Sequence, residues 1–223
     1  SRGPCVGAIS GDTTRKNKQR ICTALPMALI LASTSPIRLK LLRSAGLSVE
    51  TVAPRVDEAS VRDALVAEGA LPRDITDTLA EMKARKVAEK RPGDLVLGCD
   101  QVLEFDRRPF SKPEGPAEAR DQLRQLRGQS HKLLSAIVAY EDAQPVWRHV
   151  AEARLTMHQI SDGYLDDFVT RNWDSIRHSV GGYKIEEEGV RLFSAITGDY
   201  FTILGLPLLP LLAWLGTKGM IAR

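Results

Sequence analysis

Short apolar runs alternate with amphipathic stretches in the first part of the chain. Residues 28–32 form an apolar run that predicts a buried strand, and residues 37–45 have the spacing of a helix. Ser35 suits the N-cap of this helix, and Pro36 suits its first turn. Residues 47–53 predict a second strand, and a loop with Asp57 and Glu58 follows it.

The middle of the chain repeats this order of strand and helix. Residues 74–90 predict a long amphipathic helix, which stops at the breaker sequence of residues 91–93. Residues 95–99 predict an apolar strand that ends at Asp100, and residues 102–105 continue in an extended conformation. Residues 116–127 predict a further helix.

The last part of the chain predicts mostly hairpins. The expected elements are strands over 131–140 and 146–158, a helix over 161–172, a hairpin of 190–196 with 200–204, and a helix from about residue 207. Strands that alternate with helices early and pair as hairpins late predict an α/β fold. We expect a mixed twisted sheet flanked by helices, with two lobes around one cleft.

Composition narrows the class of protein. The chain has 223 residues, of which 43% are hydrophobic and 26% charged, as is usual for a soluble globular domain. The longest apolar run, residues 204–215, is too short to span a bilayer and contains two prolines. Three cysteines do not make a disulfide framework, so a reducing compartment is expected.

The basic charge of the chain is concentrated at its N-terminus. Residues 1–26 contain five basic residues and one acidic residue, which leaves a net charge of −1 on the rest of the chain. A nearly neutral body gives no electrostatic reason to expect nucleic-acid binding. Residues 1–26 lack apolar periodicity and predict a disordered extension, with a transit peptide as the alternative. We expect the folded domain to span residues 27–223.

Two loops offer residues suited to phosphate and metal binding. Ser33 and Arg38 flank a predicted helix N-terminus, whose free backbone N–H groups and dipole favour an anion. The alternative is an ordinary capped helix. The paired carboxylates Asp57 and Glu58 can hold a hard cation such as Mg²⁺, or can form a solvated acidic loop.

Further candidate residues lie on the predicted helix and strands. Lys83 falls within the apolar stripe of its helix, where a lysine needs a partner, although Lys86 lies nearly as close to that stripe. Asp100 follows an apolar strand, and a carboxylate there needs a partner or a metal ion. Lys112 precedes a proline that favours an extended backbone, and Glu186 follows a pair of glycines. The alternatives are that Lys112 is an exposed loop lysine and that Glu186 belongs to a solvated acidic run.

Taken together, these segments resemble the Maf family of nucleotide pyrophosphatases. The similarity covers residues 28–215 and consists of motifs that are each short but occur in the family's order. The motifs are LILASTSPIRLKLL (29–42), APRVDE (53–58), LAEMKARKVA (79–88), LVLGCDQVLEF (95–105), SKP (111–113), LRGQSHKLLSAI (126–137), GGYKIEEEG (181–189) and GDYFTILGLPL (198–208).

The resemblance implies an activity and roles for particular residues. It implies a cytoplasmic enzyme, often a homodimer, that splits a nucleoside triphosphate into a monophosphate and pyrophosphate in one substrate cleft. It also implies a divalent cation, Mg²⁺, Mn²⁺ or Co²⁺, and no nucleic-acid or membrane partner. By this resemblance Asp100 is the catalytic carboxylate, and Glu58 and Asp100 bind the metal. The residues expected to bind the phosphates are Ser33, Arg38, Lys83 and Lys112.

Three positions distinguish branches of the family, and here they are Ile37, Gln101 and Glu186. The branch that acts on dTTP and UTP typically has Arg, Thr and Gln at these positions. The 7-methyl-GTP branch has an aromatic residue, Gln and Glu. Gln101 and Glu186 therefore indicate 7-methyl-GTP, whereas Ile37 departs from the pattern because an aliphatic side chain does not stack on a cationic purine as a ring does.

Two other functions remain open at this point. The first is a dTTP/UTP pyrophosphatase, which would use the same chemistry on a different base. The second is a nucleotide-binding regulator of septum formation with little turnover. The presence of Asp100, Glu58, Lys83 and Lys112 favours an enzyme over such a regulator.

Overall fold

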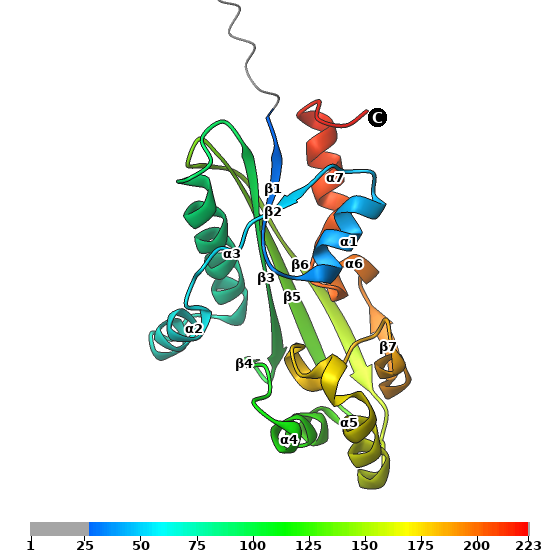
Figure 1. The fold of residues 1–223 in the computed structure, drawn as a ribbon. Coiled ribbons are helices and arrows are strands. Elements are labelled where there is room, and N and C mark those ends of the chain that lie inside the picture. The colour runs from blue at the N-terminus through cyan, green and yellow to red at the C-terminus, as the bar shows by residue number, and fades with distance from the viewer. Residues whose placement is uncertain (1–26, 223) are drawn as a thin grey trace, which may run out of the picture.

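The computed structural model describes residues 27–222 (Figure 1). The predicted disordered extension, residues 1–26, lies outside the described residues. Residues 27–222 form a mixed sheet flanked by helices, which confirms the α/β class expected from the sequence.

The sheet of the described residues has seven strands. Their order is β2-β1-β3-β5-β6-β7, and β4 pairs with the end of β3. β1 runs parallel to β2 and β3, whereas the other pairs are antiparallel. The strands are β1 (Leu29–Ala32), β2 (Glu50–Thr51), β3 (Leu95–Phe105), β4 (Arg108–Phe110), β5 (Ser130–Glu141), β6 (Gln144–Met157) and β7 (Phe193–Thr197).

The helices gather in two groups along the sheet, and these groups form two lobes (Figure 1). The long strands β3, β5 and β6 pass through both lobes. In one lobe α3 covers one face of the sheet while α1 and α7 cover the other, and α4 and α5 lie at the opposite end. The helices are α1 (Pro36–Ser44), α2 (Glu58–Ala67), α3 (Pro72–Ala88), α4 (Pro116–Leu126), α5 (Asp162–Ile176), α6 (Tyr200–Ile203) and α7 (Leu208–Thr217).

One edge of β3 is left without a partner strand between two neighbours. β1 pairs with β3 only as far as Gly98, and β4 pairs with the same strand only from Leu103 onward. The other edge of β3 is paired with β5 throughout this stretch. Residues 99–102 therefore form a gap in the sheet edge, and the backbone carbonyl of Cys99 accepts a hydrogen bond from the Arg38 side chain instead.

Side chains on β3 alternate between two cores. Val96 packs with Ala80 and Ala84 of α3, whereas Leu97 and Cys99 pack in the cluster formed with α1 and α7. Cys99 thus lies on the opposite face of the strand from Asp100.

β3 and α3 approach each other unusually closely at Gly98. A Cβ atom at this position would lie 2.1 Å from the carbonyl oxygen of Ala80 and 2.5 Å from the backbone nitrogen of Ala84. Both neighbours are helix backbone and cannot rotate away. The close contact brings Lys83, which precedes Ala84, against Asp100, which is two residues beyond Gly98 on the same strand face.

The structure corrects several expectations about individual elements. Residues 200–204 were expected to form a strand, but Tyr200–Ile203 is a short helix because the Asp199 carboxylate accepts hydrogen bonds from the backbone N–H groups of Phe201 and Thr202. The strand expected over residues 47–53 is reduced to Glu50–Thr51. Ser35 stands at the N-cap of α1, but its side chain makes no capping hydrogen bond.

Two further expectations were wrong near the cleft. Asp57 and Glu58 do not lie in a loop: the Asp57 side chain accepts a hydrogen bond from the Ser60 backbone N–H and caps α2, and Glu58 is the first residue of that helix. Asp100 does not end a strand, because β3 continues through it to Phe105.

We predict that Gly98→Ala destabilises the protein by about 2 kcal/mol or more, because the new methyl group would overlap helix backbone. The measurement is the free energy of unfolding in denaturant. Gly115→Ala is the matched control, since a Cβ at Gly115 has no neighbour within 4 Å and its φ is not positive. Equal stability of the two variants would contradict the close contact.

Candidate functional site

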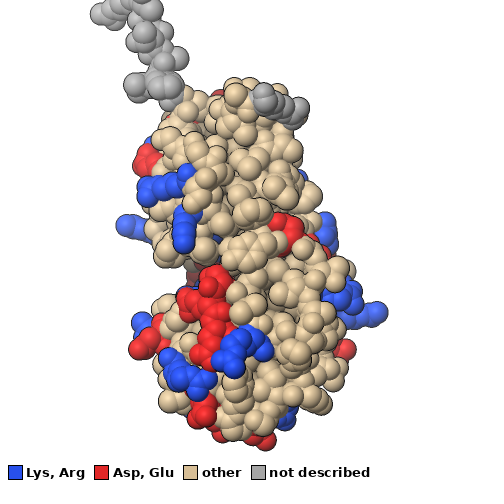
Figure 2. Space-filling view, turned by 90° about the vertical axis from the view of Figure 1, so that its right-hand side faces the viewer, with Lys and Arg blue, Asp and Glu red and all other residues tan. Residues whose placement is uncertain are grey.

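A cleft of about 1140 Å³ opens between the two lobes. Figure 2 shows the molecule narrowing there, with acidic side chains gathered on the lower lobe. The cleft lies at the gap in the edge of β3, so that Asp100 and Gln101 both line it although they point to opposite faces of the sheet. Its lining includes all the residues to which the family resemblance gave a role, namely Ser33, Ile37, Arg38, Glu58, Lys83, Asp100, Gln101, Lys112 and Glu186, whereas Asp57 is not among the lining residues.

The centre of the cleft holds a cluster of three charges. The Lys83 ammonium lies 2.7 Å from Asp100 Oδ1 and 2.9 Å from Glu58 Oε2. The side chains of Lys83 and Asp100 are 6% and 5% exposed, whereas that of Glu58 is 36% exposed. The structure also decides between the two candidate lysines on α3, because Lys83 is buried and Lys86 is exposed.

Asp100 is a carboxylate with an unsatisfied oxygen. Its Oδ2 is buried and has no hydrogen-bond partner among the described residues. Burial raises the pKa of Asp100, and the negative charge of Glu58 adds to this, while Lys83 and Arg38 oppose it. Asp100 is therefore a stronger base than an ordinary aspartate.

Glu58 has the opposite shift. Burial acts to raise the pKa of Glu58, but the positive charges of Lys83, Lys112 and Arg38 outweigh it, so the pKa is lowered. Two carboxylates that share one ammonium thus differ in proton affinity: Glu58 stays ionised, and Asp100 binds protons more readily. Such divergence is typical of acid–base sites.

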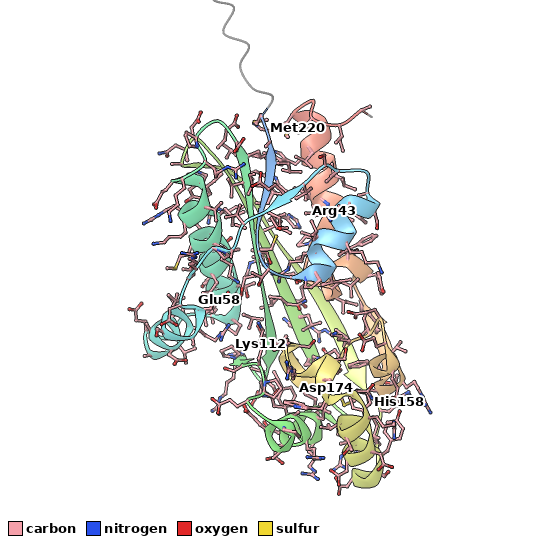
Figure 3. The ribbon with its side chains drawn as sticks, viewed as in Figure 1. Arg43, Glu58, Lys112, His158, Asp174 and Met220 are labelled. Carbon is pink, nitrogen blue, oxygen red and sulfur yellow. The ribbon has the colours of Figure 1, made fainter. Side chains whose placement is uncertain are left out.

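The side chains labelled in Figure 3 show which elements surround the cleft. Glu58, Lys112 and Asp174 lie around the space between the lobes. The Lys112 side chain is open to solvent, yet the cleft walls still disfavour its charge and lower its pKa, and Lys83 and Arg38 act in the same direction. A phosphate group would relieve this repulsion.

Arg38 is fixed by the backbone. Its Nε donates to the Gly205 carbonyl at 2.8 Å, and its Nη1 donates to the Cys99 carbonyl at 3.0 Å and to Ser33 Oγ at 3.4 Å. Ser33 Oγ in turn accepts from the Ser35 backbone N–H. These bonds occupy Nε and Nη1, so Nη2 is the nitrogen left to meet a ligand within the described part of the chain.

The three residues expected to distinguish bases all line the cleft. Ile37 is half-buried and packs against the hydrophobic core that contains side chains of α4 and α5. Glu186 is exposed. Gln101 is half-buried, and its Nε2 donates to Ser135 Oγ and to the carbonyls of Thr202 and Ile203.

The sequence analysis missed two arginines that line the cleft, Arg55 and Arg62. Arg62 Nε is buried without a hydrogen-bond partner in the described residues, and Arg55 has a φ of 50°, which L-residues rarely adopt. Arg62 lies four residues after Glu58, one turn along α2. That spacing would have signalled a shared helix face if residues 57 and 58 had not been assigned to a loop.

The residues present are suited to a divalent cation. Glu58 and Asp100 supply carboxylate oxygens, and Asp100 Oδ2 lacks a partner within the described residues. No group of three His, Cys, Asp or Glu side chains in residues 27–222 is placed to hold a metal ion. This donor set fits a hard ion such as Mg²⁺, which typically binds one or two carboxylates together with substrate phosphates and water.

Comparison with known proteins identifies the family. Residues 28–218 match the model of the family described as Maf-like protein. The chain is 59% identical over 197 residues to a protein of Ruegeria pomeroyi named nucleoside triphosphate pyrophosphatase, covering 88% of this chain and 99% of that protein. It is 44% identical over 189 residues to a Brucella abortus protein named 7-methyl-GTP pyrophosphatase, covering 85% and 95%. The chain belongs to the Maf family.

Solved structures give a weaker similarity. A HAM1 protein from Coxiella burnetii is 17% identical, with a TM-score of 0.42 over 60% of this chain and 74% of that one. At this TM-score the similarity adds nothing to the family assignment. None of the helices in residues 27–222 is long and apolar enough to cross a membrane.

We predict that Lys83→Met destabilises the protein by roughly 3 kcal/mol at pH 8, because it leaves the Asp100 charge buried without its ammonium. The loss should shrink as the pH falls toward 4. In the variant the pKa of folded Asp100 lies above its unfolded value, so folding gains stability where the group is protonated and loses it as the pH rises.

The measurement is the difference in unfolding free energy between variant and wild type across this pH range. Lys86→Met is the control, because Lys86 is exposed on the same helix. A deficit that stays constant with pH would show that Lys83 does not neutralise Asp100.

Proposed function

We propose that this protein hydrolyses 7-methyl-GTP between its α and β phosphates, releasing 7-methyl-GMP and pyrophosphate. At the coarser level it is a nucleoside triphosphate pyrophosphatase, the activity named for relatives that are 59%, 60% and 56% identical. The observation that supports the reaction best is the buried ammonium shared by Asp100 and Glu58 inside a cleft of nucleotide size.

Asp100 is the group that we assign to water activation. Its raised pKa and its unpartnered Oδ2 suit a general base that takes a proton from water. The oxygen of that water then forms a bond to the α phosphorus, and the bond from this phosphorus to the bridging oxygen breaks. Pyrophosphate leaves with that oxygen. Lys83 keeps the Asp100 side chain in place throughout.

Cations along the cleft stabilise the negative charge that develops on the phosphates. Lys112 stands at the mouth, and the Arg38 Nη2 group is directed by the backbone bonds of its other nitrogens. Groups fixed before the substrate arrives stabilise a transition state without reorganising. Glu58 and Asp100 would hold a divalent cation, which would neutralise charge on the phosphate oxygens.

Two side chains that line the cleft support the choice of 7-methylguanine. Glu186 is an exposed carboxylate with no ion pair among the described residues, and Gln101 lines the same cleft. Guanine presents N–H donors on its N1 and N2 edge. Methylation at N7 makes the base cationic, which strengthens these donors toward a carboxylate. The name of the Brucella abortus relative supports the same substrate.

We predict that Asp100→Asn lowers kcat by at least about a hundredfold, since the amide cannot accept the proton from water. Pyrophosphate release would be measured by chromatography with 7-methyl-GTP, GTP, dTTP, UTP and CTP. The wild type should prefer 7-methyl-GTP. Asp63→Asn, an exposed aspartate on α2, is the control.

Each alternative has its own outcome in this experiment. A preference for dTTP and UTP would keep the reaction but overturn the choice of base. Absence of any pyrophosphate release that depends on Asp100 would favour a nucleotide-binding regulator.

We predict that removal of divalent cations with EDTA abolishes turnover, and that Mg²⁺, Mn²⁺ or Co²⁺ restores it. Glu58→Gln should raise the half-saturating cation concentration by at least about tenfold, because one charged oxygen ligand is lost. Glu68→Gln, at the other end of α2, is the control. Identical cation dependence of wild type and Glu58→Gln would exclude Glu58 as a ligand.

A further inference from the structure

The Gln101 side chain is held by three acceptors. Its Nε2 lies 3.0 Å from Ser135 Oγ, 3.1 Å from the Thr202 carbonyl oxygen and 2.9 Å from the Ile203 carbonyl oxygen. Ser135 is the residue directly opposite Gln101 in the β3–β5 register and is completely buried. The two carbonyls belong to the last residues of α6, and the Thr202 carbonyl also accepts from the Gly205 backbone N–H.

This environment permits only one orientation of the Gln101 amide. Ser135 Oγ donates to the Thr202 carbonyl at 2.8 Å, so its hydrogen is already used and its lone pairs face Gln101. If the amide were reversed, Oε1 would face two carbonyl oxygens that cannot donate. The reversed state would lose at least two hydrogen bonds and add repulsion between oxygens.

The fixed orientation leaves one atom of Gln101 facing the cleft. Oε1 has no hydrogen-bond partner among the described residues. It is also not among the fully buried atoms that lack a partner, which means that it is accessible. Because Gln101 lines the cleft, this accessible oxygen is open to the cleft. Gln101 therefore offers a ligand an acceptor and no donor. Glu186, whose carboxylate lines the same cleft, also offers acceptor oxygens.

The turn that fixes Gln101 also holds other groups of the site. The Asp199 carboxylate caps α6 through the backbone N–H groups of Phe201 and Thr202. Two residues after α6 ends, the Gly205 carbonyl accepts a hydrogen bond from Arg38 Nε. The C-terminal carbonyls of α6 thus orient Gln101, and the turn that follows α6 orients Arg38.

We propose that Ser135 is a positioning residue that, together with the Thr202 and Ile203 carbonyls, restricts Gln101 to accepting a hydrogen bond from the substrate base. This inference relies on the proposed function for the location of the base. The ligand that fits is a base with N–H donors on its edge. Guanine supplies two adjacent donors for two acceptors, whereas uracil supplies a single N–H between two carbonyls.

The test uses wild type, Ser135→Ala, Gln101→Met and the double variant. Each is assayed with GTP and with the triphosphate of unsubstituted purine riboside, whose base has no N–H donor. Gln101→Met keeps the length of the side chain but lacks the acceptor. Ser130→Ala, an exposed serine on the same strand, is the control.

Ser135→Ala should raise KM for GTP by roughly three- to tenfold, the value of about one hydrogen bond, with kcat little changed. KM for unsubstituted purine triphosphate should not change. Adding Ser135→Ala to Gln101→Met should have no further effect, because Ser135 acts through Gln101. Equal losses for both nucleotides, or an undiminished effect of Ser135→Ala in the Gln101→Met background, would overturn the proposal.

Binding measurements separate this inference from the proposed function. Calorimetry with GMP and unsubstituted purine riboside monophosphate tests the same four proteins without turnover. One outcome is that no triphosphate is hydrolysed, while Ser135→Ala weakens GMP binding in the wild-type background and not in the Gln101→Met background. In that case the proposed function fails and this inference stands. If turnover depends on Asp100 but neither variant changes the preference between bases, the inference fails alone.

Discussion

A lysine buried between two carboxylates is the constraint on which the architecture of this site depends. Removing an ammonium group from water costs several kcal/mol, and only close, well-directed partners offset it. Lys83 has two such partners, Asp100 on β3 and Glu58 on α2. Both must be held in place, and the rest of the local structure does so: Asp57 caps α2, and Gly98 allows α3 to approach the strand.

The gap in the edge of β3 explains how one strand serves two purposes. A strand directs successive side chains to opposite faces, so Asp100 and Gln101 would normally be separated by the sheet. Here β1 pairs with β3 only as far as Gly98 and β4 pairs with it only from Leu103, and the cleft reaches β3 from its open edge. The α3 face then holds the charges suited to phosphate chemistry, and the α6 face holds the group suited to recognition of a base. A change on one face can therefore alter base preference without moving the charged cluster.

The segment after β7 illustrates how local hydrogen bonding overrides a hydrophobic pattern. Residues 200–204 are apolar enough to suggest a strand, but Asp199 satisfies two backbone N–H groups and starts a helix instead. That helix ends at the sheet with its carbonyls directed at Ser135 and Gln101, and the Gly205 carbonyl in the turn after it accepts from Arg38. A short capped helix can therefore offer its carbonyl oxygens to these side chains. The carbonyls of a hairpin strand would instead be hydrogen-bonded to the neighbouring strand.

The sequence by itself determined the α/β class, the presence of α3 and α4 to within about two residues at each end, and many of the residues that line the cleft. Periodicity and capping residues act locally, and the ordered motifs are a property of the chain alone. Only the tertiary structure decided that Lys83 and not Lys86 is buried, that Asp100 lies within a strand, and that Arg62 joins the cleft. These outcomes depend on the close approach of α3 to β3, on the edge that β1 and β4 leave open, and on the packing of α2, all of which join residues that are distant in the chain.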